Sequence, residues 1–200
     1  GRRHDLAKAA RSKVESLFTA ATMMERTLAV YREALGRSAI LVIKLSALGD
    51  AILSIPSLRA LRDRFPGAAI TVLTGVAARE AFDHCPYVTD RIICDFAGRD
   101  RGMAGLWRIG AELRRRAFAM VIDLQNNRKS HLLAYLSMAP HRYGYANGKW
   151  SLLMNRTVKD DAPYLDPVDH QFRVIRLAGV KPVDKRLELW PSAADGEKAA

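Results

Sequence analysis

Hydrophobic residues along this chain switch repeatedly between a spacing typical of buried strands and one typical of helices. Four short runs are mainly apolar and rich in β-branched residues, as expected for strands of a parallel sheet covered on both faces. They span residues 39–43, 70–73, 91–94 and 120–123. Other segments carry apolar residues three and four positions apart, which predicts helices. They span residues 55–65, 77–82, 106–118, 130–138 and 168–178.

Strands that alternate with helices in this way predict an α/β fold with a parallel sheet and flanking helices. Residue Ser130 is the expected N-cap of the fourth helix. Residues 140–167 are irregular and longer than an ordinary loop, so we expect short elements or a binding function there. Residues 187–191 alternate like an edge strand or a linker.

The chain is expected to contain three parts. Residues 1–37 read as a helical N-terminal extension, because Val14, Leu17 and Phe18 share one helical face and Gly36 fits a C-cap. Residues 38–190 form the α/β domain, and residues 191–200 begin a linker or a second domain.

Composition excludes several classes of protein. The 200 residues are 49% hydrophobic and 26% charged, which is ordinary for a globular domain and argues against global disorder. No apolar run is long enough to cross a membrane, and no apolar signal-peptide core stands near the start. Two cysteines are too few for a disulfide framework, so a cytoplasmic location is expected.

The charge balance predicts an anionic partner. The net charge is +11, and residues 99–129 contain eight basic and three acidic residues. A phosphorylated ligand, an anionic membrane surface and a solvated basic surface all fit this charge. No signature of a nucleic-acid-binding fold is present, so a nucleic-acid partner is not expected.

The turn after the first strand carries the strongest candidate chemistry. Residues 44–50 follow that strand, and ligands of open parallel sheets gather at the carboxyl ends of strands. Gly49 would let the backbone approach a ligand, and the amides that open the next helix favour an anion. Asp50 is either a helix-capping carboxylate or a general base. The turn is neither a Walker loop nor a dinucleotide fingerprint, and no metal-ligand spacing is present.

The sequence around this turn resembles a known family. The string ILVIKLSALGDAILSIP at residues 40–56 resembles the N-terminal signature of glycosyltransferase family 9, the bacterial heptosyltransferases of lipopolysaccharide core assembly. Shorter similar strings follow in the family's order, and the resemblance runs from about residue 40 to residue 190. They are LRALR at 58–62, FPG at 65–67, VIDLQ at 121–125, KS at 129–130, RYGY at 142–145 and HQFRVIRLAG at 170–179.

The resemblance implies the N-terminal domain of a GT-B glycosyltransferase. In this family that domain binds the acceptor, while a C-terminal domain binds the nucleotide sugar, typically ADP-heptose. Transfer inverts the anomeric centre and uses no metal or other cofactor. Because the donor binds to that C-terminal domain, residues 1–200 alone are expected to be inactive. The acceptor is a glycolipid at the inner membrane face, so a cytoplasmic or peripheral membrane location is expected.

The resemblance also assigns roles to individual residues. It makes Asp50 the general base that removes the acceptor hydroxyl proton. The expected substrate-binding residues surround the same turn and the one after the fourth strand: Lys44, Ser46, Gly49, Gln125, Arg128 and Lys129. The family usually has glycine where this chain has Asn126. Asparagine tolerates a left-handed backbone, so the turn is expected to survive, whereas the acceptor preference is open.

Some alternatives remain open at this point. Residues 1–36 either resemble the C-terminal end of a glycosyltransferase family 4 domain or form an amphipathic helix that packs on the domain or lies on the membrane. Tyr143 and Tyr145 could stack on a sugar ring, whereas His131 and His170 read as capping or surface groups. The rival to an enzyme is a non-catalytic Rossmann-like module that binds a phosphorylated or anionic ligand.

Overall fold

A computed structural model describes residues 19, 23–24, 39–148, 150–161, 165–182 and 184–191. The chain divides into a unit of residues 1–37 and a unit of residues 38–200. Of the first unit only Thr19, Met23 and Met24 are described, so the helix expected over residues 1–36 lies otherwise outside the described residues. Residues 192–200 lie outside them as well. The sheet and the helices that cover it belong to the second unit.

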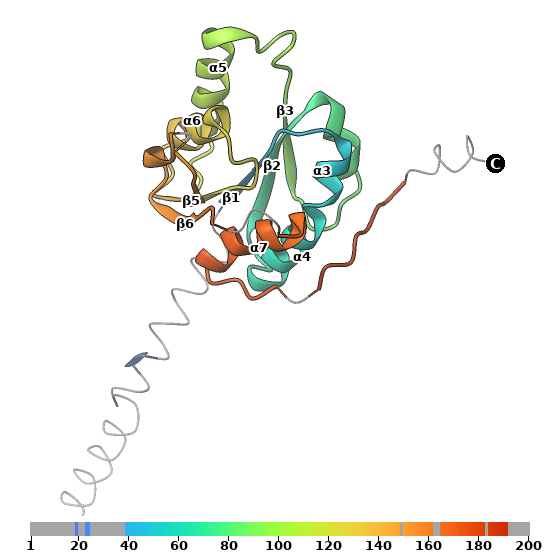
Figure 1. The fold of residues 1–200 in the computed structure, drawn as a ribbon, viewed down its shortest axis with the longest axis vertical. Coiled ribbons are helices and arrows are strands. Elements are labelled where there is room, and N and C mark those ends of the chain that lie inside the picture. Colours follow the sequence, from blue (N-terminus) through green and yellow to red (C-terminus); the bar gives the residue numbers. More distant parts are fainter. Residues whose placement is uncertain are drawn as a thin grey trace, which may run out of the picture. The chain divides into compact units, whose positions relative to one another are not determined.

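Six parallel strands form a single sheet in the order β3-β2-β1-β4-β5-β6 (Figure 1). The chain runs outward from β1 to β3 and then returns to place β4 on the other side of β1. The strand order therefore reverses between β1 and β4, which confirms the predicted α/β fold and fixes where ligands of such sheets bind. The strands are β1 Ala39–Lys44, β2 Ala69–Gly75, β3 Asp90–Cys94, β4 Met120–Asp123, β5 His141–Ala146 and β6 Arg156–Lys159.

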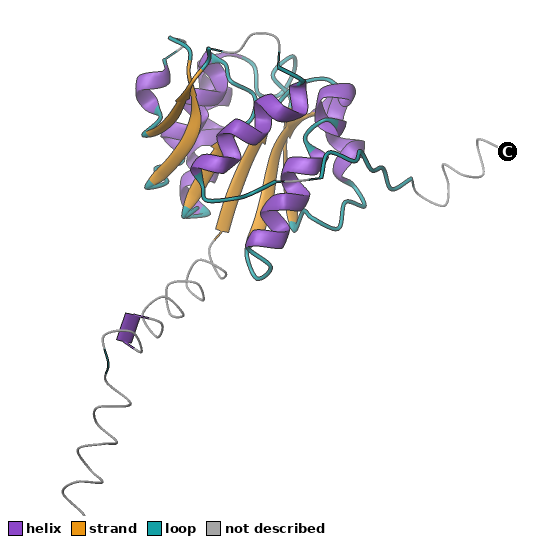
Figure 2. Cartoon of the chain, turned by 60° about the horizontal axis from the view of Figure 1, so that its bottom comes forward, coloured by secondary structure: helices purple, strands orange, loops and turns teal. Residues whose placement is uncertain are grey.

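Helices cover both faces of the sheet (Figure 2). On one face α4 lies beside α7, and on the other α5 lies beside α6. The α-helices are α3 Leu48–Ile52, α4 Ile55–Arg64, α5 Gly102–Arg115, α6 Arg128–Leu136 and α7 Pro167–Leu177. Two 3₁₀ segments, η1 Val76–Phe82 and η2 Ser151–Leu153, complete the described elements.

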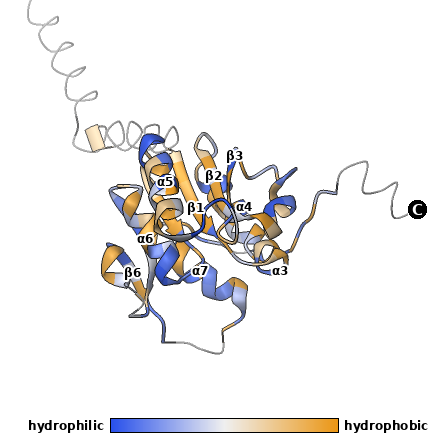
Figure 3. Ribbon diagram, turned by 90° about the horizontal axis from the view of Figure 1, so that it is seen from above, coloured by the Kyte–Doolittle hydropathy of each residue, from blue (hydrophilic) through white to orange (hydrophobic). Residues whose placement is uncertain are grey.

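The centre of the core is β1, whose residues 40–43 are fully buried. Because successive side chains point to opposite faces, Leu41 and Ile43 join one cluster with Val121 of β4 and with Leu113 of α5. Ile40 and Val42 point to the other face. Each fully buried aliphatic side chain contributes about 1.5–3 kcal/mol. Figure 3 shows the hydrophobic colour concentrated on the central strands.

The structure differs from the sequence prediction in several elements. The irregular segment at 140–167 contains β5, η2 and β6; the expected short elements are present, but their strand character was not predicted. The segment at 77–82 belongs to a 3₁₀ helix rather than an α-helix. Residues 187–191 pair with no described strand. Ser130 is not the N-cap of α6, because the side chain of Asn127 accepts from the Ser130 amide and makes Asn127 the cap.

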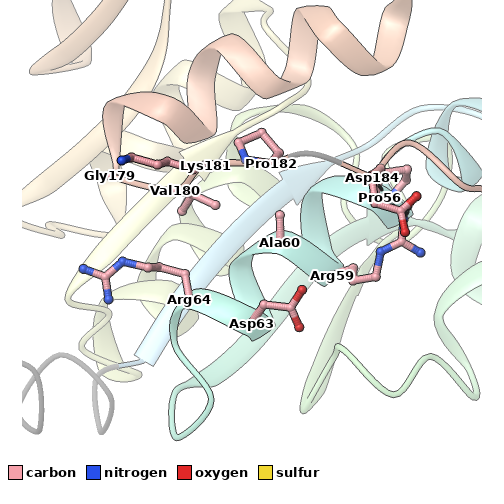
Figure 4. Close-up of a pocket in the computed structure, with 10 residues that line it drawn as sticks. All are labelled: Pro56, Arg59, Ala60, Asp63, Arg64, Gly179, Val180, Lys181, Pro182 and Asp184. Atoms are coloured by element: carbon pink, nitrogen blue, oxygen red, sulfur yellow. Dashed lines mark hydrogen bonds and ion pairs between the residues drawn. The ribbon is translucent and has the colours of Figure 1, made fainter.

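The segment after α7 is held against the domain by one arginine of α4. The buried guanidinium of Arg59 donates to the carboxylate of Glu188 at 2.6 Å and to the carbonyls of Asp184 and Arg186 at 3.1 Å. Tyr87 donates its hydroxyl to the same Glu188 carboxylate at 2.7 Å. Figure 4 shows Arg59 pointing toward Asp184, with which it also forms an ion pair. Residues 184–188 are thus fixed to α4 and the loop before β3.

Replacing Arg59 is predicted to destabilise the domain. An Arg59→Ala change leaves a carboxylate and two carbonyls without their cationic donor, which costs about 1–3 kcal/mol. Urea denaturation should show the loss as a lower midpoint. Arg64→Ala on the same helix, an exposed position, should stay within about 0.5 kcal/mol of the parent. Equal effects of the two substitutions would contradict the anchoring role.

Candidate functional site

The carboxyl ends of β1 and β4 lie side by side, because Ile43 pairs with Asp123 in the sheet. Lys44 ends β1, and the turn after β4 begins at Leu124. This is the point at which the strand order reverses, so both turns open onto the crevice that binds ligands in sheets of this kind.

Gln125 joins the two turns. Its side-chain oxygen accepts from the backbone amide of Leu45 at 2.8 Å and from the hydroxyl of Ser46 at 2.6 Å. These bonds connect residues about 80 positions apart in the sequence. Two of the predicted substrate-binding residues, Ser46 and Gln125, are therefore in direct contact, and each restricts the other's position.

The carboxylate of Asp123 fixes the shape of the turn after β4 through hydrogen bonds. One carboxylate oxygen accepts from the amides of Gln125 at 2.8 Å and Asn126 at 3.1 Å, and the other accepts from the hydroxyl of Ser130 at 2.7 Å. Burial raises the pKa of Asp123, while the Ser130 hydrogen bond and the nearby His131 oppose that rise. The carboxyl group is fully buried and shapes the turn rather than facing a ligand.

Asn126 adopts the left-handed conformation expected of it. Its φ of 58° is one that glycine adopts freely and asparagine tolerates. Its side-chain oxygen also accepts from the amide group of Asn147 at 2.7 Å. The turn therefore keeps its course with asparagine in place of glycine, and it gains a contact that glycine could not make.

A pocket of about 330 Å³ opens between these turns and the start of α7. Three predicted site residues, Lys44, Asp50 and Gln125, line it together. Asp50 lies exposed in the first turn of α3, whose N-cap is Ala47, so of the two alternatives for Asp50 the structure excludes the N-cap. Among the described residues none forms a hydrogen bond or ion pair with its carboxylate, which leaves it available to a ligand.

Lys44 brings a buried positive charge to this pocket. Its ammonium group donates to the carbonyl of Leu124 at 3.4 Å, a long and weak bond. Burial lowers the pKa of Lys44, and attraction to Asp50 and Asp123 opposes that shift. Titratable groups whose pKa is shifted by burial are common in functional sites, so Lys44 is a candidate for binding a ligand in this pocket.

His170 is the site residue that sequence reasoning missed. It lies in α7 and lines the same pocket. Its Nε2 atom lies 3.1 Å from a carboxylate oxygen of Asp160, and its ring stacks on Tyr145 with centroids 4.0 Å apart. The only sequence signal was its place in the string at 170–179. Tyr145 is 1% exposed, which argues against the alternative that it stacks on a sugar ring.

A second pocket, of about 670 Å³, opens on the other side of Gln125. Its lining includes Phe96, Arg128 and Lys129. Arg128 and Lys129 are exposed at the start of α6, and the Lys129 ammonium group lies 4.1 Å from the centre of the Phe96 ring. These two cations and the helix N-terminus give this pocket a positive potential that suits an anionic group.

Gly49 lies apart from both pocket linings. It belongs to α3, and a Cβ atom built on it would meet no atom within 4 Å. The fold itself therefore does not require glycine at this position. A further pocket of about 490 Å³, between α4 and the segment after α7, contains none of the predicted site residues (Figure 4).

Within the described part of the chain, no group of three or more His, Cys, Asp or Glu side chains is placed to hold a metal ion. None of the helices described there combines the length and the apolar character that crossing a membrane requires.

Substituting Lys44 is predicted to stabilise the domain in a pH-dependent way. Lys44→Met removes the charge that burial disfavours, so the denaturation midpoint at neutral pH should rise. The folded-state pKa of Lys44 lies below its usual 10.5, so between the two values the unfolded chain binds more protons and the parent gains stability as pH rises. The advantage of the variant should therefore shrink toward pH 10.5.

The exposed Lys159→Met change in β6 is the matched control, and it should not raise the denaturation midpoint at neutral pH. A Lys44→Met variant that is less stable than the parent at neutral pH would contradict the prediction.

Comparisons with known proteins find similarity to heptosyltransferases. The model of glycosyltransferase family 9 (heptosyltransferase) matches residues 106–197. Over 166 residues the chain is 28% identical to lipopolysaccharide heptosyltransferase 2 of Salmonella typhimurium, covering 80% of this chain and 48% of that protein. The chain thus spans about half the length of the curated relatives it matches.

Solved structures show the same relationship. A family 9 glycosyl transferase from Veillonella parvula is 25% identical with a TM-score of 0.71, over 78% of this chain and 46% of that one. The E. coli ADP-heptose lps heptosyltransferase II is 26% identical with a TM-score of 0.63, over 80% of this chain and 48% of that one. The predicted resemblance is confirmed: the chain is similar to heptosyltransferases and to glycosyltransferase family 9.

Proposed function

We propose that this chain is the acceptor-binding half of an inverting glycosyltransferase. The enzyme would transfer a heptose or a similar sugar from a nucleotide sugar to a lipopolysaccharide core acceptor. The observation that carries the proposal is the pocket in which the carboxylate of Asp50, unpaired among the described residues, faces the same space as Lys44, Gln125 and His170. A carboxylate in a crevice at the strand-order reversal is suited to remove a proton from a bound hydroxyl.

The relatives support the choice of donor and acceptor. The E. coli neighbour is described as an ADP-heptose lps heptosyltransferase, and the Salmonella relative as a lipopolysaccharide heptosyltransferase. We therefore take ADP-heptose as the donor and a lipopolysaccharide core glycolipid as the acceptor. In the family the donor is bound mainly by a C-terminal domain, and no other cofactor takes part. The acceptor's position implies work at the cytoplasmic face of the inner membrane.

The proposed reaction is a single displacement. The acceptor hydroxyl oxygen attacks the anomeric carbon and forms the new glycosidic bond, while the bond from that carbon to the diphosphate breaks. The hydroxyl proton passes to Asp50, and the nucleoside diphosphate leaves with the electron pair. Attack from the face opposite the leaving group inverts the anomeric centre. Only one protein base is needed for this step.

The other residues of the site would bind and orient the acceptor. The Lys44 ammonium group attracts an anionic group of the acceptor and shares the pocket with Asp50. Gln125, with its oxygen bound to Leu45 and Ser46, keeps its amide NH₂ for a hydroxyl or carboxylate. Arg128 and Lys129 would bind a phosphate or carboxylate of the acceptor in the neighbouring pocket. Ser46 would orient the Gln125 side chain through its hydrogen bond, and the lack of a side chain at Gly49 would leave space for the acceptor.

A non-catalytic module that binds a phosphorylated ligand is the second candidate. The positive pocket at Arg128 and Lys129 favours it, because those side chains can bind an anion whether or not a reaction follows. The two candidates differ in their requirement for Asp50. Only the enzyme needs the Asp50 carboxylate, which removes a proton from the acceptor.

Replacing Asp50 is predicted to abolish transfer without removing binding. In the full-length protein that contains this chain, Asp50→Asn should lower kcat by about 10²–10⁴-fold, the usual contribution of a general base. The acceptor KM should change little, because the amide keeps the shape of the carboxylate. Sugar transfer from ADP-heptose to a lipopolysaccharide core acceptor is the assay.

Asp63→Asn is the matched control, since Asp63 is an exposed aspartate on the neighbouring helix α4. It should leave kcat and KM unchanged. Transfer at the parent rate by the Asp50→Asn variant would refute the assignment of the base. Acceptor binding without transfer by the full-length parent would favour the binding module.

Removing the two cations of α6 is predicted to weaken acceptor binding. Arg128→Ala with Lys129→Ala should raise the acceptor KM about tenfold or more, because a hydrogen bond to a charged group contributes about 1.5–3 kcal/mol net of its exchange with water. The kcat at saturating acceptor should stay within about twofold of the parent. The control is Arg79→Ala in η1, which removes an exposed arginine outside both pockets. An unchanged acceptor KM would place the acceptor's anionic groups elsewhere.

A further inference from the structure

The outward face of α5 has a composition that the proposed reaction does not explain. Seven exposed residues share this face at helical spacing and include no acidic side chain. They are Met103, Ala104, Trp107, Arg108, Ala111, Arg114 and Arg115. The face is therefore apolar at its N-terminal end and basic at its C-terminal end.

The apolar residues of this face are not used by the core. Met103 is 61% exposed and Trp107 is 57% exposed, which is unusual for side chains of this size. The opposite face of α5 does the packing, through residues such as Ile109, Gly110 and Leu113. Gly110 approaches α6 so closely that an added Cβ would lie 2.8 Å from Leu136. The helix is thus fixed by its inner face, and its outer face is presented as a rigid surface.

The outward charge of this helix is positive. Arg108 forms an ion pair with the buried Asp100, whereas Arg114 and Arg115 form no ion pair with any described residue. The acidic residues nearby are already paired, since Arg116 bonds to both Asp90 and Glu112. Trp107, Ala111, Arg114 and Arg115 together line a hollow of about 260 Å³. This places an indole ring next to two available guanidinium groups.

We propose that this face of α5 docks on the surface of an anionic lipid bilayer. Tryptophan is favoured at the level of the lipid headgroups, because its ring is apolar and its N–H remains hydrated. Met103 and Trp107 would enter the interface there. Arg114 and Arg115 would contact lipid phosphates, because each basic residue near an anionic surface strengthens the attraction to that surface. A basic helix with an exposed apolar stripe has the composition of an interfacial helix.

A bilayer fits this face better than a nucleic acid does. Contacts to nucleic-acid phosphates would use Arg114 and Arg115 but would leave Met103 and Trp107 exposed.

The position of α5 relative to the candidate site also fits a bilayer that carries the acceptor. The helix follows β3 and so begins at the carboxyl edge of the sheet, the edge at which Lys129 contacts Phe96 in the positive pocket. In Figure 1, α5 lies on the outside of the domain next to α6, away from α4 and α7.

This proposal rests on the proposed function only for the membrane location of the acceptor, and its test needs no sugar transfer. Binding of the purified protein would be measured by co-sedimentation with vesicles of phosphatidylglycerol and phosphatidylethanolamine, and with vesicles of phosphatidylcholine alone. We expect binding to the anionic vesicles that weakens as salt rises. Met103→Ala with Trp107→Ala, and separately Arg114→Gln with Arg115→Gln, should each lower the affinity about tenfold or more.

Two controls keep the test decisive. Leu152→Ala removes the most exposed large apolar side chain among the described residues, outside α5, and should bind as the parent does. Asp50→Asn should also bind vesicles as the parent does, which separates this proposal from the catalytic one. In a protein with Trp150 and Trp190 changed to phenylalanine, the fluorescence of Trp107 should shift to shorter wavelength on vesicle binding. That measurement covers the case in which the α5 variants fold poorly.

Three results would overturn the proposal. The first is a parent protein that does not bind the anionic vesicles. The second is binding that survives both double substitutions and disappears only when residues 1–37 are deleted. The third is a Trp107 fluorescence that does not respond to vesicles but changes with protein concentration or with added DNA, which would assign the face to a second copy of the chain or to a nucleic acid.

Discussion

The bond between Gln125 and the turn after β1 is the contact on which the site depends. Two strands that are about 80 residues apart in sequence lie side by side in the sheet, and one side-chain oxygen connects the turns that leave them. Asp123 supports this arrangement from the core by fixing the amides of Gln125 and Asn126. The strand order brings the two turns together, and this small network gives them a defined shape.

The positions of the charged groups in the site depend on this hydrogen-bonded network. Lys44 ends the buried strand β1, so its ammonium group reaches the pocket from a poorly hydrated position, and it forms a long hydrogen bond to the carbonyl of Leu124. Asp50 approaches the same pocket from an exposed helical turn, where no described residue pairs with its carboxylate. His170 enters from the other side of the pocket, positioned by Asp160 and Tyr145. The pocket therefore gathers groups of opposite charge that leave room for a ligand between them.

The sequence was sufficient for the parts of the fold in which local pattern and burial agree. The first four strands have continuous apolar runs, and the structure places them within one or two residues of the prediction. Asn126 was also predictable, because few residues other than glycine accept its backbone conformation. β5 and β6 were not predictable, because neither strand contains an apolar run. Polar residues or glycine interrupt both strands, and their pairing beside β4 is a tertiary effect.

The site residues divide in the same way into those that could be predicted from the sequence and those that could not. Lys44, Asp50 and Gln125 were predictable because they follow strands at the expected edge of the sheet and belong to strings that resemble a family. His170 lies within α7, distant in sequence, and only the packing of that helix against β4, β5 and β6 brings it to the pocket. Side-chain hydrogen bonds decide such details as the cap of α6, which the sequence predicted to be Ser130 and which is Asn127.

The central claim is that the acceptor hydroxyl binds beside Asp50 at the junction of β1 and β4. A crystal structure of the full-length protein with a phosphorylated core acceptor would test it most directly. The account predicts that the reacting hydroxyl lies within about 2.6–3.2 Å of the Asp50 carboxylate, the range of a hydrogen bond to a general base. It also predicts an anionic group of the acceptor at Arg128 and Lys129. An acceptor bound instead in the pocket between α4 and the segment after α7, with its hydroxyls far from Asp50, would contradict the account.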